Sequence, residues 1–469
     1  MAAALAGRVV GAVRRRMRRA WSRLTRWGRR PSAEAALLWL VGAEIDTGGL
    51  SETPGAPTAS PALTAAAIET ALELACREEA RRWARWLASI QRADGSIPDP
   101  TTGAASFENT IDGVRAFRAI AHDVPEVEEP VDRACRYLGW SIDADGRLRM
   151  PSEHPARTGA PVAGSLGECT RLAAQYLEED RPSEAAAMMK EVSAAQRMNG
   201  SVRELFDRGP VYSASLARAA VVWYRLGCRA QADRAVRFLE RRQNRNGGFR
   251  RGWGTLFGRA MRQEDAWAAK LFLDAVVLRV RAAFDDAAAL PNRIDPSDGR
   301  MRAVKRWFET LPGDCVADVG CGQGRFLRHL RSWFPQAPLT GIDVSPAMLA
   351  ALPEGVTPCR GSLLRIPAPD ATFDGVFAVE SLEHALVPER ALAELCRVVR
   401  PGGRVLVIDK HESKQALSEC EPWERWFLPD ELAAWLARHC DDVAVEPISH
   451  GEGRAGDRLF LAATGTRRA

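Results

Sequence analysis

VADVGCGQGRF, residues 316 to 326, decides the fold of the back part of this chain. An apolar stretch is followed there by Gly320, Gly322 and Gly324. A strand that runs into such a turn, with a helix after it, typically holds a nucleotide-like ligand at its carboxyl end. A dinucleotide fingerprint would need glycine where this chain has Arg325, and no Gly-Lys-Ser/Thr follows as in a nucleoside triphosphatase loop. The turn therefore indicates a different nucleotide-like ligand.

From residue 301 to the end, apolar stretches alternate with amphipathic ones, as in CVADVG, GRFLRHLRSWFP and PLTGIDV. This alternation predicts strands and helices in turn, and hence a mostly parallel sheet covered by helices on both faces. Ligands of such folds bind at the carboxyl ends of the strands, where the glycine turn is expected to lie.

The glycine turn resembles the first motif of class I S-adenosylmethionine-dependent methyltransferases. Two later stretches, RGSLLRIPAPDATFDGVFAVESLEHA and PERALAELCRVVRPGGRVLVID, resemble the following segments of their small-molecule branch, the type 11 enzymes related to quinone biosynthesis. The resemblance covers residues 301–469. It implies a Rossmann-like α/β fold, S-adenosyl-L-methionine as the cofactor and methyl transfer as the reaction.

The resemblance also assigns cofactor-binding residues. Glycines let the turn lie against the ligand because they lack a Cβ. Asp343, at the end of the next predicted strand, suits a carboxylate that accepts bonds from both ribose hydroxyls. Ser362 stands where the family has an acid that meets the adenine amino group, so its hydroxyl or the Leu363 backbone is expected there, with weaker affinity. The predicted set is Asp318, Gly320, Cys321, Gly322, Gly324, Asp343, Val344, Ser362, Leu363 and Val379.

Candidate catalytic groups follow the next strand, in VESLEHA. His384 is the first choice for a general base that takes the acceptor's proton, with Glu383 beside it. Two alternatives stay open at this point: a role in shaping the cofactor site, and a divalent ion held by Glu380, Glu383 and His384. The metal therefore remains undetermined.

Two later segments are expected near the same crevice. Asp409, Lys410, His411 and Glu412 follow the next strand and either contact the acceptor or form a polar loop. The segment HESKQALSECEPWERW, residues 411–426, begins with two of these residues and is the stretch available as a lid. It is short for that purpose, but it contains Trp423 and Trp426, which could cover a small acceptor.

The front region, residues 32–285, contains a repeat. Gln-x-x-x-Gly turns end at Gly95, Gly200 and Gly247, and a weaker copy has Gly146, so the spacing is about 50 residues. Helical stretches with apolar residues at three and four separate the turns, and hairpins of this kind must stack to bury their faces. The turns resemble those of terpenoid-cyclase-like and prenyltransferase-like α/α toroids. An open solenoid of helix pairs is the alternative.

The resemblance to toroids does not extend to their catalytic motifs. The sequence has no Asp-x-Asp-Asp cluster and no recognisable zinc-binding set, and Asp143 and Asp145 occupy a turn position that predicts a loop role. Residues 286–300 then gather Pro, Asp, Asn and Gly, which predicts a linker to the methyltransferase-like domain at 301–469.

Charge is unevenly distributed along the 469 residues. Residues 1–31 hold ten arginines and no acid, although the whole chain nets only +5, so the remainder is acidic. This leader is either a flexible basic tail or an amphipathic helix on an anionic membrane surface. An acidic body argues against a nucleic-acid substrate. The ten scattered cysteines and the absence of a long apolar run predict a cytoplasmic protein, and peripheral contact with the membrane through the leader is the alternative.

These observations predict an S-adenosylmethionine-dependent methyltransferase that acts on a small-molecule, glycan or lipid-linked acceptor, with the helical domain binding that acceptor. Two alternatives differ in the role of the front region. It either carries its own lyase, hydrolase or cyclase activity, or it is a scaffold that recruits the methyltransferase to a protein complex. The oligomeric state is left open.

Overall fold

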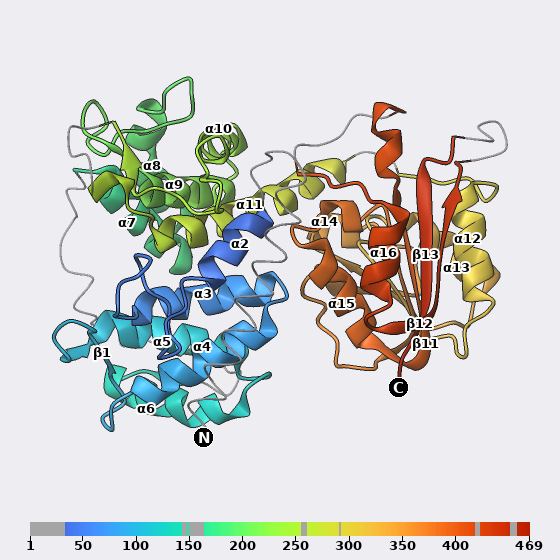
Figure 1. The fold of residues 1–469 in the computed structure, drawn as a ribbon, viewed down its shortest axis with the longest axis horizontal. Coiled ribbons are helices and arrows are strands. Elements are labelled where there is room, and N and C mark those ends of the chain that lie inside the picture. The colour runs from blue at the N-terminus through green and yellow to red at the C-terminus, as the bar shows by residue number, and fades with distance from the viewer. Residues whose placement is uncertain are drawn as a thin grey trace. The chain divides into compact units, whose positions relative to one another are not determined.

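The structure is a computed structural model that describes residues 33–142, 148–149, 164–254, 260–289, 292–417, 423–450 and 457–469. Two compact units are present (Figure 1). The first contains the described residues up to Ile68 and those of Arg81–Val276; the second contains those of Glu69–Ala80 and Val277–Ala469. The predicted leader, residues 1–31, and the turn acids Asp143 and Asp145 lie outside the described residues.

The first unit is built from helices joined by short two-stranded ribbons, as the periodicity of the sequence predicts. Serines begin two of its helices: Ser106 accepts a hydrogen bond from the backbone of Asn109, and Ser165 accepts one from Glu168. The described helices are α2 (Ala33–Val41), α3 (Pro61–Glu73), α4 (Arg77–Ile90), α5 (Phe107–Ile120), α6 (Glu128–Leu138), α7 (Leu166–Glu178), α8 (Pro182–Ala194), α9 (Ser213–Arg225), α10 (Arg229–Glu240) and the first part of α11 (Ala266–Ala287). The paired strands are β1 (Ile97–Pro98) with β2 (Ala105–Ser106), β3 (Ser141–Ile142) with β4 (Leu148–Arg149), and β5 (Val211–Tyr212) with β6 (Gly252–Trp253).

The repeated glutamine connects its own turn to the next hairpin. Gln196 donates from Nε2 to the carbonyl of Gly200 at 3.2 Å and to that of Gln231, at the start of α10, at 2.9 Å. Its Oε1 accepts from Arg234 of α10 at 2.8 Å. Gln91 makes the same set of bonds to Gly95, Pro130 and Arg133. The repeat therefore preserves a bond between neighbouring hairpins as well as a turn shape.

The repeated glycine permits a close backbone contact at the same junction. Gly95, Gly200 and Gly247 have φ angles of 90°, 93° and 90°. A Cβ on them would lie 2.1, 2.0 and 2.1 Å from the carbonyl oxygens of Arg133, Arg234 and Ala35, respectively. The first two contacts join a turn to the next helix pair. The third joins the turn after α10 to α2, the first helix that the structure describes.

We expect Gly200→Ala to lower the free energy of unfolding by about 3 kcal/mol, because alanine is strained at this φ and its Cβ would meet a backbone oxygen. Gly227 is a matched control: its φ is 74°, but no atom lies within 4 Å of an added Cβ. Gly227→Ala should therefore cost only about 1 kcal/mol, from strain alone. Urea denaturation of both variants measures the difference, and equal costs would contradict the close contact.

The second unit is an α/β domain with a seven-stranded sheet in the order β12-β13-β11-β10-β7-β8-β9. The pairs from β11 through β9 are parallel, and β13 runs antiparallel to β11 and β12. In Figure 1, α12 and α13 lie on one side of the sheet and α15 and α16 on the other. The strands are β7 (Val316–Val319), β8 (Leu339–Asp343), β9 (Val356–Arg360), β10 (Phe373–Val379), β11 (Val399–Lys410), β12 (Cys440–Ile448) and β13 (Phe460–Arg467). The helices are α12 (Gly299–Phe308), α13 (Arg325–Trp333), α14 (Pro346–Leu349), α15 (Pro388–Val398) and α16 (Pro429–Leu436).

This α/β architecture confirms the predicted sheet. Every residue of β7 is buried, as expected for a central parallel strand covered on both faces. Because β7, β8, β9 and β10 are parallel, their carboxyl ends meet at one edge, where the glycine turn follows β7. The RPGG stretch, residues 400–403, lies within β11, where the register jumps from Phe373–Val399 to Gly375–Arg404.

The division between the units differs from the predicted boundary at residues 285 and 286. Helix α11 is continuous from Ala266 to Ala287, and the units divide inside it, between Val276 and Val277. The Pro, Asp, Asn and Gly signal of residues 286–300 marks the end of that helix and the cap of α12, where Asp298 accepts from Arg300. A helix can leave one core and enter another without a loop, so a composition shift locates the helix end rather than the division of the cores.

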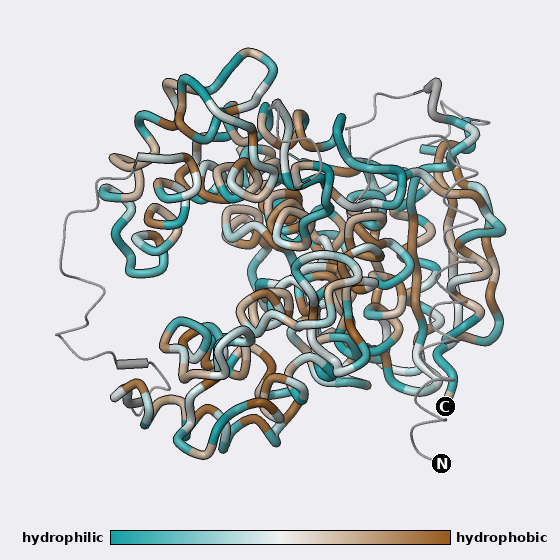
Figure 2. The backbone as a smooth tube through the Cα atoms, turned by 60° about the vertical axis from the view of Figure 1, so that its left-hand side comes forward, coloured by the Kyte–Doolittle hydropathy of each residue, from teal (hydrophilic) through white to brown (hydrophobic). Residues whose placement is uncertain are grey.

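Hydropathy follows this layout. Figure 2 shows brown, apolar stretches along the strands of the sheet and teal, hydrophilic stretches in many of the connecting loops. Among the helices that the structure describes, none combines the length and apolarity required to span a bilayer.

Candidate functional site

The three glycines of the turn after β7 all have left-handed backbones, with φ angles of 77°, 53° and 73° for Gly320, Gly322 and Gly324. Their surroundings differ. A Cβ on Gly320 would lie 2.5 Å from Ser381, and one on Gly324 would lie 2.7 Å from Leu352. A Cβ on Gly322 would meet only the sulfur of Met348, at 3.9 Å. The outer glycines therefore permit packing, whereas Gly322 borders open space that a ligand can enter.

Asp343, the last residue of β8, holds this turn in place. Its Oδ2 accepts from the backbone N–H of Gly322 at 2.9 Å, and its Oδ1 accepts from that of Ser345 at 2.9 Å. The side chain is 7% exposed, and burial raises its pKa while the backbone N–H groups oppose the rise. Each oxygen keeps an acceptor position beyond these bonds, so the carboxylate can meet a ligand's paired hydroxyls.

A partly open cavity with an empty volume of about 1030 Å³ lies over the carboxyl ends of the strands. This volume includes the open solvent at the mouth of the cavity, so the residues on the wall define the site better than its size does. Its wall includes nine of the predicted residues: Gly320, Cys321, Gly322, Asp343, Val344, Ser362, Leu363, Val379 and His384. The structure thus brings most of the predicted site together.

Three predicted residues do not line the cavity. Gly324 packs under Leu352, and Glu383 is buried behind His384. Asp318 is buried inside β7, where burial raises the pKa of its carboxyl well above the ordinary value, and its Oδ2 has no hydrogen-bond partner within the described part of the chain. The structure therefore places Asp318 beneath the turn and away from the ligand side.

Sequence reasoning missed one wall of the cavity. The second part of α11 contributes Val277, Val280, Arg281 and Phe284, and Glu73 at the end of α3 also lines it. All these residues belong to the second compact unit. The spacing of residues 277, 280, 281 and 284 indicates that they share one face of a helix. The sequence does not show that this face lines the cavity, because the predicted front domain extends to residue 285.

Ser362 is already engaged in its own loop. Its Oγ accepts from the backbone N–H groups of Leu364 at 3.3 Å and of Arg365 at 3.0 Å. A serine oxygen has two acceptor positions, so only its O–H remains to donate to a ligand. The predicted role of the Ser362 hydroxyl as an acceptor for an adenine amino group therefore does not fit this geometry.

Glu380, which follows β10, forms ion pairs with Arg300 and Arg325. Burial would raise the pKa of Glu380, but the two guanidinium groups outweigh it and lower the pKa below its ordinary value. The backbone of Glu380 is left-handed, with φ of 51°, and in this conformation its side chain reaches both arginines. Glu380 is thus a fixed carboxylate on the cavity wall, and Arg325, the residue that broke the dinucleotide fingerprint, is one of its two partners.

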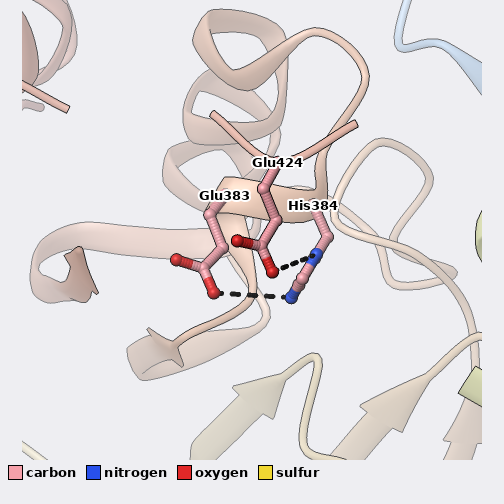
Figure 3. Close-up of side chains that lie close together, drawn as sticks. All are labelled: Glu383, His384 and Glu424. Carbon is pink, nitrogen blue, oxygen red and sulfur yellow. Dashed lines mark ion pairs between the residues drawn. The ribbon is translucent and has the colours of Figure 1, made fainter. Parts of the chain in front are cut away.

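His384 ends the short helix η4 (Leu382–His384) and lies between two carboxylates (Figure 3). Its Nε2 is 3.4 Å from Oε1 of Glu383, and its Nδ1 is 3.9 Å from Oε1 of Glu424. Burial lowers the pKa of His384 to about 4, and Glu424 opposes the shift. The imidazole is therefore neutral at ordinary pH and can accept a proton.

A lysine completes this cluster behind His384. Lys410 places Nζ 2.9 Å from Glu383 and 3.4 Å from Glu424. Asp409 accepts from the backbone N–H of Glu383, and burial together with the Asp409 charge raises the pKa of Glu383 to about 10. The ion pair with Lys410 would lower the pKa of Glu383. We assign the raised pKa, because three buried acids, Glu383, Asp409 and Glu424, share one ammonium group and the cluster must therefore retain a proton.

The arrangement does not favour a divalent ion. The donor atoms of Glu383, His384 and Glu424 lie within 4.8 Å of one another, with Glu424 in the place that the sequence motif suggested for Glu380. However, the Lys410 ammonium contacts both carboxylates, which leaves little room for a second cation. The remaining predicted side chains, His411, Glu412, Trp423 and Trp426, do not line the cavity.

Comparison with known proteins matches the family described as "Methyltransferase domain" to residues 317–407. A probable chloroplastic tocopherol O-methyltransferase of Oryza sativa subsp. japonica is 33% identical over 175 residues, covering 34% of this chain and 46% of that protein. A 2-methyl-6-phytyl-1,4-hydroquinone methyltransferase of Synechocystis is 32% identical over 146 residues, covering 29% of this chain and 45% of that protein. A 2-phytyl-1,4-naphtoquinone methyltransferase of Thermosynechococcus vestitus is 28% identical over 178 residues, covering 34% of this chain and 79% of that protein. The chain thus spans less than half the length of the first two relatives.

We expect the stability of the protein to fall as the pH decreases from about 6.5 to about 4, because the unfolded chain binds a proton at His384 that the folded chain does not. This contribution is fully present above pH 6.5 and is lost through that window, with a size of about 1–3 kcal/mol. His384→Gln should remove it. Urea denaturation at several pH values measures the effect, and identical pH profiles for the two proteins would refute it.

We expect the protein to bind Mn²⁺ only weakly and Lys410→Met to bind it more tightly, because the substitution leaves Glu383, Glu424 and His384 without their cation. Isothermal titration calorimetry measures both affinities. Lys414→Met, four residues away, is the matched control and should behave like the unaltered protein. Tighter Mn²⁺ binding by the unaltered protein than by Lys410→Met would show that the lysine does not occupy the cation position.

Proposed function

We propose that this chain is an S-adenosyl-L-methionine-dependent methyltransferase that acts on a small-molecule acceptor with an apolar part. The observation that carries the proposal is the pairing of Asp343 with the turn: its carboxylate bonds to the N–H of Gly322, the one glycine of the turn that borders open space. The match of residues 317–407 to the methyltransferase domain family supports the same cofactor.

The residues on the cavity wall fit this cofactor. Asp343 would accept bonds from the ribose hydroxyls, and Gly322 would let the backbone approach the amino-acid portion. Met348 and Leu363 offer apolar contact for a base. The carboxylate of Asp343 has no arginine partner among the contacts described above, and it favours a positively charged ligand in the cavity. When bound, S-adenosyl-L-methionine supplies a methyl group on a positively charged sulfur.

His384 is the proposed general base. It lines the cavity, its imidazole is neutral, and it can accept the proton of an acceptor hydroxyl as the methyl group is transferred. Glu424 lies beside Nδ1 of His384 and would stabilise the imidazolium that results. The Phe284 ring stands edge-on to the imidazole, with centroids 5.0 Å apart, and restricts its orientation. Glu383, whose raised pKa keeps a proton in the cluster, is thus a supporting group beside Nε2.

The acceptor class follows from the wall that α11 provides. Val277, Val280, Phe284 and Leu386 present apolar side chains to the cavity, which suits an aromatic or isoprenoid acceptor better than a free sugar. The names of the similar proteins, which refer to tocopherol, a phytyl hydroquinone and a phytyl naphthoquinone, point to the same class. A lipid-linked acceptor fits this wall, and a glycan fits it less well.

We further propose that the first unit is an α/α toroid that selects the acceptor. The return of the Gly247 turn to α2 supports a closed ring over an open solenoid. Helix α11 supports the selective role, because it begins among the helices of the first unit and ends on the cavity wall of the second. A separate catalytic activity of the toroid and a scaffolding role are the alternatives. A cytoplasmic location, with membrane contact through residues 1–31, stays a prediction.

We expect Asp343→Ala to weaken S-adenosyl-L-methionine binding by about 100-fold or more, because two hydrogen bonds to a charged group are lost. Isothermal titration calorimetry on the full chain measures this. Asp314→Ala, an exposed acid just before β7, is the matched control and should bind as the unaltered protein does. Equal affinities for Asp343→Ala and the control would overturn the cofactor assignment.

The acceptor class can be tested with methyl-labelled S-adenosyl-L-methionine and a host extract separated into lipids, water-soluble small molecules, glycans, proteins and RNA. We expect label in the lipid fraction, because the cavity wall is apolar, and we expect His384→Gln to reduce its rate of appearance by about 100-fold. Label in the protein or RNA fraction would contradict a small-molecule acceptor.

A further inference from the structure

One hydrogen-bonding requirement of the proposed cofactor is not met by any side chain of the cavity-lining loop that follows β9. The cavity wall there consists of Gly361, Ser362, Leu363 and Leu364. An adenine ring brings an exocyclic amino group, which donates and therefore needs an acceptor. The Ser362 oxygen already accepts from Leu364 and Arg365, and the two leucine side chains carry no polar atom. This inference rests on the proposed function, since it concerns the same cavity.

Glu73 lies on the wall beside this loop. Its Oε1 is 2.8 Å from Nη1 of Arg365, three residues after Ser362, and its Oε2 accepts from Arg281 of α11. The side chain is 26% exposed, so the carboxylate is accessible from the cavity. A carboxylate has about four acceptor positions. The two arginines use one on each oxygen, which leaves acceptor capacity for a ligand.

The segment that carries Glu73 is fixed to the domain by charged contacts. Glu69–Ala80 belongs to the second compact unit. Arg77 pairs with the buried Glu394 at 3.2 Å, and Arg390 pairs with Glu79 at 3.0 Å and donates to the carbonyl of Ala75 at 3.1 Å. These contacts lie in the turn that follows α3 and in the first residues of α4, so they hold Glu73 at the cavity.

Other polar groups on the described wall serve elsewhere. Arg281 and Arg365 are donors only. Glu380 is paired with Arg300 and Arg325, and Asn292 accepts from Arg325 at 3.3 Å, so both lie toward α13 and not toward the Ser362 loop. Asp343 also borders that loop, but its carboxylate holds the glycine turn and is assigned to the ribose. Of the wall carboxylates that the structure describes, Glu73 is therefore the one left to face the Ser362 loop.

We propose that Glu73 accepts a hydrogen bond from the exocyclic amino group of adenine and so makes the site selective for an adenine cofactor. The residue stands far before the glycine turn in the chain, in the helical region. The part of the chain that precedes the methyltransferase domain thus completes the cofactor site, in addition to its proposed role toward the acceptor.

The test compares two neutral-sulfur ligands on the full chain, S-adenosylhomocysteine and S-inosylhomocysteine, in which a carbonyl oxygen replaces the amino group. The unaltered protein should bind the adenosyl compound about 10- to 100-fold more tightly, because Glu73 attracts the amino group and repels a carbonyl oxygen. Glu73→Ala should reduce this ratio to about 1 to 3. Glu73→Gln, of nearly the same shape, can donate to the carbonyl and should bring the ratio to 1 or below.

Calorimetric titration gives the ratio for each variant, and Glu354→Gln, an exposed glutamate of the same domain, is the matched control that should keep the original ratio. If Glu73 only supports the fold, both ligands weaken together and the ratio stays unchanged, which would overturn the proposal. Glu73→Gln keeps the test informative if Glu73→Ala does not fold. If the unaltered protein binds neither ligand, the proposed cofactor itself is wrong, an outcome distinct from an unchanged ratio.

Discussion

The hydrogen bond from the backbone of Gly322 to the carboxylate of Asp343 is the contact on which the site depends. It joins the turn after β7 to the end of the neighbouring strand β8, and the same turn is also held by bonds from Gly320 and Cys321 to the carbonyl of Ile342. A left-handed turn of three glycines has little intrinsic preference for one shape. The carboxylate and the adjacent carbonyl select that shape, and the floor of the cavity follows from it.

Charge is distributed around this floor in two separate ways. Two arginines form ion pairs with Glu380 at the cavity wall. They lower its pKa, so the carboxylate stays ionised. Behind His384, by contrast, Lys410 is shared among several buried acids, so a proton remains in the cluster and the imidazole stays neutral. Buried charges are costly unless they are paired, and a partly compensated cluster beside a cavity is typical of groups that handle protons. The proposed electrostatic role and the proposed proton-accepting role thus belong to different groups.

The helical region achieves regularity by a different means. Gln91 and Gln196 each bond to the next hairpin, and the three repeated glycines let two backbones come close. Stability of such stacks is a sum of contacts between neighbours. The repeated residues therefore lie at the junctions between neighbouring hairpins. Glu73 and the last turns of α11 line the cavity of the second unit, and they lie outside the repeated turns.

The sequence by itself determined the order of strands and helices in residues 301–469, the glycine turn, the importance of Asp343 and the repeat of the front region, because these depend on local periodicity and on the conformational freedom of glycine. Only the tertiary structure decided which side chains share the cavity. It placed Asp318 and Gly324 away from the cavity, used the acceptor capacity of Ser362 within its own loop, and paired Glu380 with arginines. It also placed Glu424 beside His384 and brought α11 and Glu73 to the cavity wall. Contacts of this kind join residues that are distant in the chain. They are set by how the elements pack, and no spacing within a single motif encodes them.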